Sequence, residues 1–360
     1  MNRPVSIAKR TGPRTSRNAC IALALALAPL LFAQSADRTQ IRSNAIALEQ
    51  QGQNAEAEQL WDSLAKTNPR DAEALAHLGL LQARQNHYGA AIDHYRQALA
   101  IDPNLPGLRM NLGLALFKAA QFPEALTYFS AELRKHPGDP RLIILLGMAH
   151  YGMKDYLVTI PYLQRAAETD PQNVALRTTL AHSCMASKQY PCVLKVHQEI
   201  LSLNAESAEA DLLAAEALDQ VRDTAGATKA LRAAIQADPK QPNVHFGLGY
   251  LLWRQSHWAE AADQFQLEIQ NDPRHEKARL YLADVWLQQK EFDKALPLLE
   301  ELVAQDPSEP LAHRDLGIIY EHAGRSKDAV AEHKLAIQAD LPNDLPRLAE
   351  LISALEAPSP

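Results

Sequence analysis

The chain is poor in the residues that mark several classes of protein. Its 360 residues include only 3 cysteines and 14 glycines, and aromatic residues make up 6%. This composition excludes a disulfide-dense scaffold and a collagen-like chain. Basic residues are also outnumbered, because the formal net charge is -7. Nucleic-acid binders need a basic face for phosphate contacts, so we expect no nucleic-acid partner.

Common catalytic motifs are missing as well. The sequence contains no Gly-x-Ser-x-Gly, no Gly-x-x-x-x-Gly-Lys and no His-Glu-x-x-His, which are typical of hydrolases, nucleotide-binding enzymes and metalloproteases. His87 and His94 lie seven residues apart, but no third metal ligand follows in register. We therefore predict no catalytic site, no metal, no cofactor and no small-molecule substrate.

Residues 1–36 have the pattern of a targeting segment. Basic residues without any acid precede an apolar run from Ala19 to Ala33, and small residues follow at Ser35 and Ala36. This order is typical of a secretory signal peptide. The run has about 15 residues, fewer than the roughly 20 that span a bilayer. We predict cleavage and export to the bacterial periplasm or the cell exterior, with no transmembrane segment in the mature chain. The alternative is a chain anchored in the membrane by an uncleaved N-terminal segment.

The rest of the chain is periodic. Proline recurs at intervals of 34 or 68 residues between Pro69 and Pro307. When each unit is numbered from 1 to 34, with Arg38 as position 1, positions 8 and 20 carry mostly small residues. The units predicted by this numbering are 38–71, 72–105, 106–139, 140–173, 174–207, 208–241, 242–275, 276–309 and 310–343.

Each unit has the pattern of a helix hairpin. Apolar residues recur at helical spacing over positions 1–14 and 18–30, with a short polar turn between them. Small residues at positions 8 and 20 let the two helices approach closely, and proline at position 32 ends the second helix. A lone hairpin cannot bury its apolar face, so the units must stack into an all-α array.

This pattern resembles the tetratricopeptide repeat family through the Leu-Gly or Leu-Ala pair at positions 7–8, alanine at 20, an aromatic residue or leucine at 24 and proline at 32. The resemblance implies an α-solenoid, a right-handed superhelix of about nine helix-turn-helix repeats. It also implies that the first helices line a concave groove for a peptide or a protein. After the repeats, residues 345–356 are predicted to form a capping helix and 357–360 a tail.

By the same resemblance, positions 2, 5, 6, 9, 12 and 13 face the groove, and two stretches there are unusually apolar. The first stretch comprises Met110, Leu114, Phe117, Ile144, Leu145, Met148 and Tyr151, and the second stretch comprises Phe246, Tyr250, Trp253, Leu280 and Tyr281. We predict that these side chains anchor a partner. Polar residues at groove positions would orient it, namely Asn111, Lys118, Arg141, Arg254 and Lys277. The alternative is that coiling of the repeats buries the apolar residues against one another.

Some features recur 136 residues apart, which is four repeats. The third and seventh repeats share a glutamate at position 27, Glu132 and Glu268, and each is followed nine residues later by a base, Arg141 or Lys277. The recurrence indicates a duplicated block of four repeats. A carboxylate in a partly buried seam is costly without a partner, so we predict a structural ion pair in each copy. The alternative is that the pair forms a polar spot on the groove wall.

Cys184 and Cys192 lie in the fifth repeat, one on each predicted helix and close to the turn. An oxidising compartment would permit a disulfide between them, and two buried free thiols are the alternative. Taken together, the sequence predicts an exported, non-catalytic adaptor that binds a segment or helix of a partner protein. The alternative is a periplasmic assembly chaperone or a regulatory subunit of an envelope or secretion enzyme complex.

Overall fold

The computed structural model describes residues 37–203 and 205–338, and the regular structure in these ranges is α-helical throughout. The predicted all-α helical-repeat fold is therefore confirmed. The predicted signal peptide, the capping helix, the tail and residues 339–343 of the ninth repeat lie outside the described residues. Of the helices that are described, none combines the length and the apolar character that a bilayer crossing requires.

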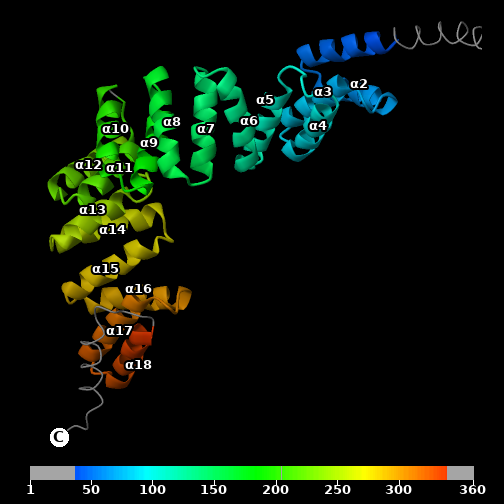
Figure 1. The fold of residues 1–360 in the computed structure, drawn as a ribbon. Coiled ribbons are helices and arrows are strands. Elements are labelled where there is room, and N and C mark those ends of the chain that lie inside the picture. Colours follow the sequence, from blue (N-terminus) through cyan, green and yellow to red (C-terminus); the bar gives the residue numbers. More distant parts are fainter. Residues whose placement is uncertain (1–36, 204, 339–360) are drawn as a thin grey trace, which may run out of the picture. The chain divides into compact units, whose positions relative to one another are not determined.

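The helices fall into two compact units that divide after Lys154 (Figure 1). The first unit holds a helix over residues 37–50 and then α2 (Asn54–Thr67), α3 (Ala72–Arg84), α4 (Tyr88–Ile101), α5 (Leu108–Lys118), α6 (Phe122–Lys135) and α7 (Pro140–Gly152). The second unit holds α8 (Tyr156–Thr169), α9 (Val174–Ala186), α10 (Tyr190–Ser202), α11 (Ala208–Gln220), α12 (Thr224–Ala237), α13 (Val244–Arg254), α14 (Trp258–Asn271), α15 (Glu276–Gln288), α16 (Phe292–Gln305), α17 (Pro310–His322) and α18 (Ser326–Gln338).

Within each unit, helices pack mainly on their neighbours in sequence. In the first unit α4 contacts both α3 and α5, and in the second unit α14 contacts both α13 and α15. First helices of successive repeats also touch one another, as α3 does with α5 and α13 with α15. Figure 1 shows the resulting rows of helix pairs. Such nearest-neighbour packing is the arrangement in which stacked repeats share a continuous core.

The small residue at position 8 has a specific packing partner. In the seventh repeat, a Cβ added to Gly249 would lie 2.8 Å from ring carbons of Phe265, the residue at position 24. Gly113 meets the ring of Phe129 in the same way in the third repeat. Both phenylalanines are fully buried. Glycine at position 8 therefore lets a large ring fill the space between the two helices of one repeat.

The hairpin turns share a left-handed backbone conformation at one position, although the residue type at that position varies from repeat to repeat. Position 15 of each repeat has a positive φ between 57° and 75°, in the order Gly52, Asn86, Ala120, Lys154, Lys188, Arg222, Ser256, Lys290 and Gly324. After α3, His87 N–H donates to Gln82 O at 2.9 Å and Asn86 N–H donates to Ala83 O at 3.1 Å. These two bonds define a Schellman motif, which satisfies carbonyl groups at the helix end and turns the chain into the next helix.

Candidate functional site

The first helix of the seventh repeat, α13, begins at a buried carboxylate. Its N-cap residue Asn243 has φ 69° and provides no side-chain cap. Instead, the Glu268 carboxylate on α14 accepts the backbone N–H groups of Asn243 at 2.9 Å and Phe246 at 3.0 Å. Glu268 is 1% exposed. The unpaired N–H groups and the positive end of the helix dipole stabilise its buried charge.

The ion pairs predicted for the inter-repeat seams are wrong. Glu268 binds the start of α13, whereas Lys277 is exposed to solvent. In the third repeat, Glu132 binds Lys135 at 3.0 Å, and Arg141 binds Asp139 at 2.9 Å. The hydrogen bond from Arg141 lowers the pKa of Asp139. The sequence argument considered only charged side chains and did not count the free N–H groups at a helix start as partners.

Four of the five residues of the second stretch form an aromatic cluster, and the fifth is buried. Phe246, Tyr250 and Trp253 follow one another along α13, with ring centroids 6.3 Å and 5.8 Å apart. Tyr281 of α15 packs edge-on against Tyr250 at 5.4 Å and Trp253 at 5.0 Å, and burial raises the pKa of its hydroxyl. Leu280 is 8% exposed and belongs to the core instead. The sequence analysis offered two alternatives for these residues, exposure to a partner or burial against one another. The rings of the cluster cover one another and yet remain partly exposed, so both descriptions apply in part.

A hollow of about 340 Å³ opens beside this cluster, between α11 and α13. We call it the α11–α13 hollow. Its lining comprises Leu212, Ala215, Glu216, Asp219, Leu231, Asn243, Phe246, Gly247, Tyr250 and Leu251. Two of the predicted anchors, Phe246 and Tyr250, thus form one wall, while α11 supplies two carboxylates on the other. Sequence reasoning missed Glu216 and Asp219, although both occupy groove positions of the sixth repeat, because it selected apolar, basic and amide side chains there and no acidic ones.

The basic residues predicted to orient a partner differ in how far they are already engaged. Arg254 donates to Asp219 Oδ1 at 2.6 Å and lies over the Tyr250 ring at 5.8 Å from its centroid. Arg141 is paired with Asp139, while Lys118 and Lys277 are exposed on the surface. Arg254 therefore contacts two lining residues of the hollow, whereas Lys277 is exposed on α15.

The first stretch is more dispersed than the second. All seven of its side chains are half-buried, and so is Asn111. Phe117 packs its ring against Phe122 at 5.5 Å and Phe129 at 6.2 Å, so it covers the interior of its own repeat. Met110 lines a separate hollow of about 270 Å³ together with the loop before α5 and the side chains of Glu132 and Lys135. Met148 and Tyr151 lie on α7.

A disulfide joins the two helices of the fifth repeat. Cys184 of α9 and Cys192 of α10 are bonded, with their Cα atoms 5.8 Å apart. This separation lies within the usual range for a disulfide. Cys184 is fully buried. The bond closes a short loop over the turn between α9 and α10.

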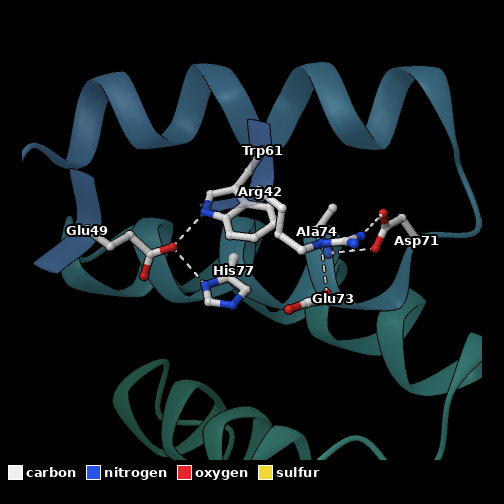
Figure 2. Close-up of polar contacts among 7 residues, drawn as sticks. All are labelled: Arg42, Glu49, Trp61, Asp71, Glu73, Ala74 and His77. Atoms are coloured by element: carbon white, nitrogen blue, oxygen red, sulfur yellow. Dashed lines mark hydrogen bonds and ion pairs between the residues drawn. The ribbon is translucent and has the colours of Figure 1, made fainter. Parts of the chain in front are cut away.

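Figure 2 shows a polar cluster in the first two repeats that the sequence did not reveal. The Glu49 carboxylate, whose side chain is 8% exposed, accepts from Trp61 Nε1 at 2.6 Å and contacts His77 Nδ1 at 2.7 Å. The Trp61 and His77 rings stack at 4.2 Å. Nearby, Arg42 bridges Asp71, the last residue of the first repeat, and Glu73 of the second repeat. In the first repeat, Glu49 stands at position 12 and Trp61 at position 24. The same two positions pair in the ninth repeat, where Glu321 contacts the His333 ring nitrogen at 2.9 Å.

Metal ligands do not gather in the part of the chain that the structure describes. Within residues 37–203 and 205–338, no three histidine, cysteine, aspartate or glutamate side chains converge on one point. The ring of His94 contacts the Ala90 carbonyl oxygen at 3.0 Å.

Comparison with known proteins assigns the repeats. A tetratricopeptide repeat model matches residues 43–106, 212–276, 246–310 and 282–344, and a second model of this repeat matches 82–149. The chain is 24% identical to BBSome complex member BBS4 of Bos taurus over 58% of this chain and 40% of that protein. It is 24% identical to anaphase-promoting complex subunit 3 of Schizosaccharomyces pombe (68% and 37%), and 25% identical to cellulose synthase operon protein C of Pseudomonas fluorescens (82% and 25%). The chain thus spans 40% or less of the length of these relatives.

Solved structures show the same fold. The hetero-tetramer Cut9–Hcn1 of the APC/C matches with a TM-score of 0.50 and 14% identity, over 84% of this chain and 59% of that chain. The C-terminal part of a TPR repeat-containing protein from Cytophaga hutchinsonii matches with a TM-score of 0.53 and 15% identity, over 66% of this chain and 97% of that chain.

Proposed function

Because the chain belongs to the tetratricopeptide repeat family, whose members are generally protein-interaction scaffolds, we propose that it is a non-catalytic adaptor. Its first helices bind an extended segment or a helix of a partner protein. The observation that carries this proposal is the α11–α13 hollow, in which the half-exposed rings of Phe246 and Tyr250 line an open space between two successive repeats.

The geometry suits a side-chain anchor. Ligand pockets begin at about 300 Å³, so a hollow of about 340 Å³ accepts one large side chain rather than a whole domain. The rings that line it are held in place by the aromatic cluster. Trp253 Nε1 is fixed by a 2.6 Å hydrogen bond to Asp284. A wall that is ordered before binding loses little conformational entropy when a partner arrives.

The first stretch, on α5 and α7 of the first unit, is a separate candidate contact surface. Met110 and Met148 are flexible and polarisable, so they adapt to varied shapes. Lys118 and Arg141 are exposed on the same two helices, and Lys118 would make polar contacts with the partner while Arg141 is paired with Asp139.

Export is the second element of the proposal. The N-terminal sequence supports it, and so does the Cys184–Cys192 bond, because disulfides persist in oxidising compartments. The test is mass spectrometry of the protein recovered from the periplasm and the medium of its host. We expect the recovered protein to lack residues 1–36. We also expect Cys184 and Cys192 to react with an alkylating reagent only after reduction. An intact N-terminus in the membrane fraction would instead indicate the anchored form.

A stable subunit of a larger complex is the second candidate. The names of two relatives favour it, since they are a BBSome complex member and an anaphase-promoting complex subunit. A subunit or assembly chaperone co-purifies with one partner at fixed stoichiometry, whereas an adaptor exchanges its partners. Native mass spectrometry of the protein isolated from its host separates these two outcomes.

The binding proposal can be tested with a random 12-residue peptide library displayed on phage and selected on the purified chain. Tyr250→Ala should weaken the selected peptides by about tenfold or more, as expected for an aromatic anchor. The matched control is Leu267→Ala, which removes an exposed side chain from the second helix of the same repeat. Circular dichroism checks that both variants fold. Selected peptides whose affinity is the same for both variants would refute the role of this hollow.

A further inference from the structure

The helix α11 carries four carboxylates and no base, and three of the four have basic partners in neighbouring repeats. Glu209 contacts His182 at 2.6 Å, Asp211 contacts His197 at 2.6 Å, and Asp219 contacts Arg254 at 2.6 Å. The fourth is Glu216, which faces the α11–α13 hollow.

Glu216 has no hydrogen bond or ion pair within residues 37–203 and 205–338. Among the described residues, the basic group that influences it electrostatically is His182, which is already bound to Glu209. Burial at the wall raises the pKa of the Glu216 carboxyl, although the side chain remains accessible from the hollow. An accessible but partly dehydrated carboxylate gains more from a cation than one in bulk water does.

The opposite wall is aromatic. The negative face of an aromatic ring attracts cations, and Tyr250 already holds the Arg254 guanidinium carbon 5.8 Å from its centroid. Phe246 lies 6.3 Å from Tyr250 and continues this wall. Because Arg254 and Asp219 neutralise each other, the charge left in the lining of the hollow is that of Glu216.

We propose that the α11–α13 hollow accepts a lysine or arginine side chain of the bound protein segment, with Glu216 as its counter-ion and the Tyr250 and Phe246 rings as its apolar walls. The assignment rests on the proposed function. It names a cationic residue within an apolar stretch as the element that this chain recognises. An acidic or phosphorylated side chain is excluded from the hollow, because it would meet the Glu216 carboxylate without a free cation to balance it.

The test repeats the peptide selection on the full chain and on three variants. The unmodified chain should enrich lysine or arginine next to apolar residues. Glu216→Gln should abolish that enrichment and weaken the selected peptides by about tenfold, the effect of losing a charge-assisted contact at a partly open site. Glu216→Lys should shift the selection toward aspartate and glutamate. Glu209→Gln is the matched control on the same helix, and it should leave the peptide preference unchanged.

The outcomes separate this inference from the proposed function. Peptides that depend on Tyr250 but show no cationic preference would overturn the assignment of Glu216 while leaving the groove as a binding site. Failure to enrich any peptide would overturn both. Binding of the free polyamine spermine to the purified chain is measured as a separate probe. If spermine binds stoichiometrically and no peptide is enriched, the hollow is a polyamine site and the peptide proposal is overturned.

Discussion

The left-handed residues at position 15 make a prediction that depends on backbone conformation alone. Ala120 has φ 57° in the turn between α5 and α6. An L-residue in this region is disfavoured by about 1–2 kcal/mol. Glycine avoids that cost but loses about 0.5–1 kcal/mol more in conformational entropy on folding. Ala120→Gly should therefore stabilise the protein by about 0.5–1 kcal/mol.

Two matched variants isolate the cause. Ala119→Gly changes the preceding residue, whose φ is -82°. Glycine gains nothing there, so this variant should be destabilised by about 0.5–1 kcal/mol. The reverse exchange, Gly324→Ala, should also destabilise. Its φ is 69°, and the added Cβ would meet no atom within 4 Å, so no steric contact confuses the result.

Urea unfolding followed by circular dichroism measures the free energy of unfolding for all three variants. Repeat arrays do not always unfold in one step, so hydrogen exchange of the α5 and α6 amides should accompany it. Slower exchange in these two helices is expected for Ala120→Gly. If Ala120→Gly lowers stability as Ala119→Gly does, the backbone argument is refuted, and with it the role of the Schellman turn in these hairpins.

Three further predictions concern packing and charge. Gly249→Ala should destabilise the protein by about 1–3 kcal/mol, because the new methyl group would press on the Phe265 ring. The control is Gly89→Ala, whose added Cβ would meet no atom within 4 Å and should not destabilise the protein. Thermal melting compares the two variants. Glu49→Ala should cost about 1–3 kcal/mol by leaving its tryptophan and histidine partners unsatisfied, and faster hydrogen exchange confined to the first two repeats would be the signature. Since burial raises the pKa of Glu216, the folded state holds this proton more tightly than the unfolded state. Its contribution to stability is therefore present at low pH and is lost as the pH rises through the raised pKa. Glu216→Gln should flatten that loss, which begins above the ordinary glutamate pKa of about 4.3, in urea titrations, and an unchanged slope would count against the shift.

The sequence was sufficient for the helices but not for the turns between them. Small residues at position 8 in every repeat, mostly small residues at position 20, and proline at position 32 in seven of the nine repeats mark the sequence, so the period of 34 residues could be read directly. Position 15 carries no such mark, because residues as different as Ala120, Lys188 and Arg222 occupy the same left-handed conformation. Only the backbone is shared there, and side-chain patterns do not report it.

The candidate site was predicted unevenly for a related reason. Aromatic residues at groove positions were visible from the resemblance, and the structure places Phe246 and Tyr250 at a hollow. The α11 carboxylates are paired by bases that lie in other repeats and come close only in the folded chain. The carboxylate that stays unpaired is therefore decided by the fold. The sequence alone could show that α11 has four acids and no base, but not that Glu216 is the one left over. The same limit produced the wrong partner for Glu268, whose charge is balanced by backbone groups.

The third and seventh repeats, which the sequence pattern predicts to be copies of one another, differ at their shared glutamate. In both, the first helix starts after a left-handed residue, Gly107 at φ 74° and Asn243 at φ 69°. These residues lie 136 positions apart, as the predicted duplication requires. Yet the shared glutamate is 25% exposed in the third repeat, where it binds a neighbouring lysine, and 1% exposed in the seventh, where it binds the start of α13. A helix whose first turn is held by a buried carboxylate is a firmer support for Phe246 and Tyr250 than an open one. This difference therefore favours the seventh repeat over the third as the location of the proposed binding site.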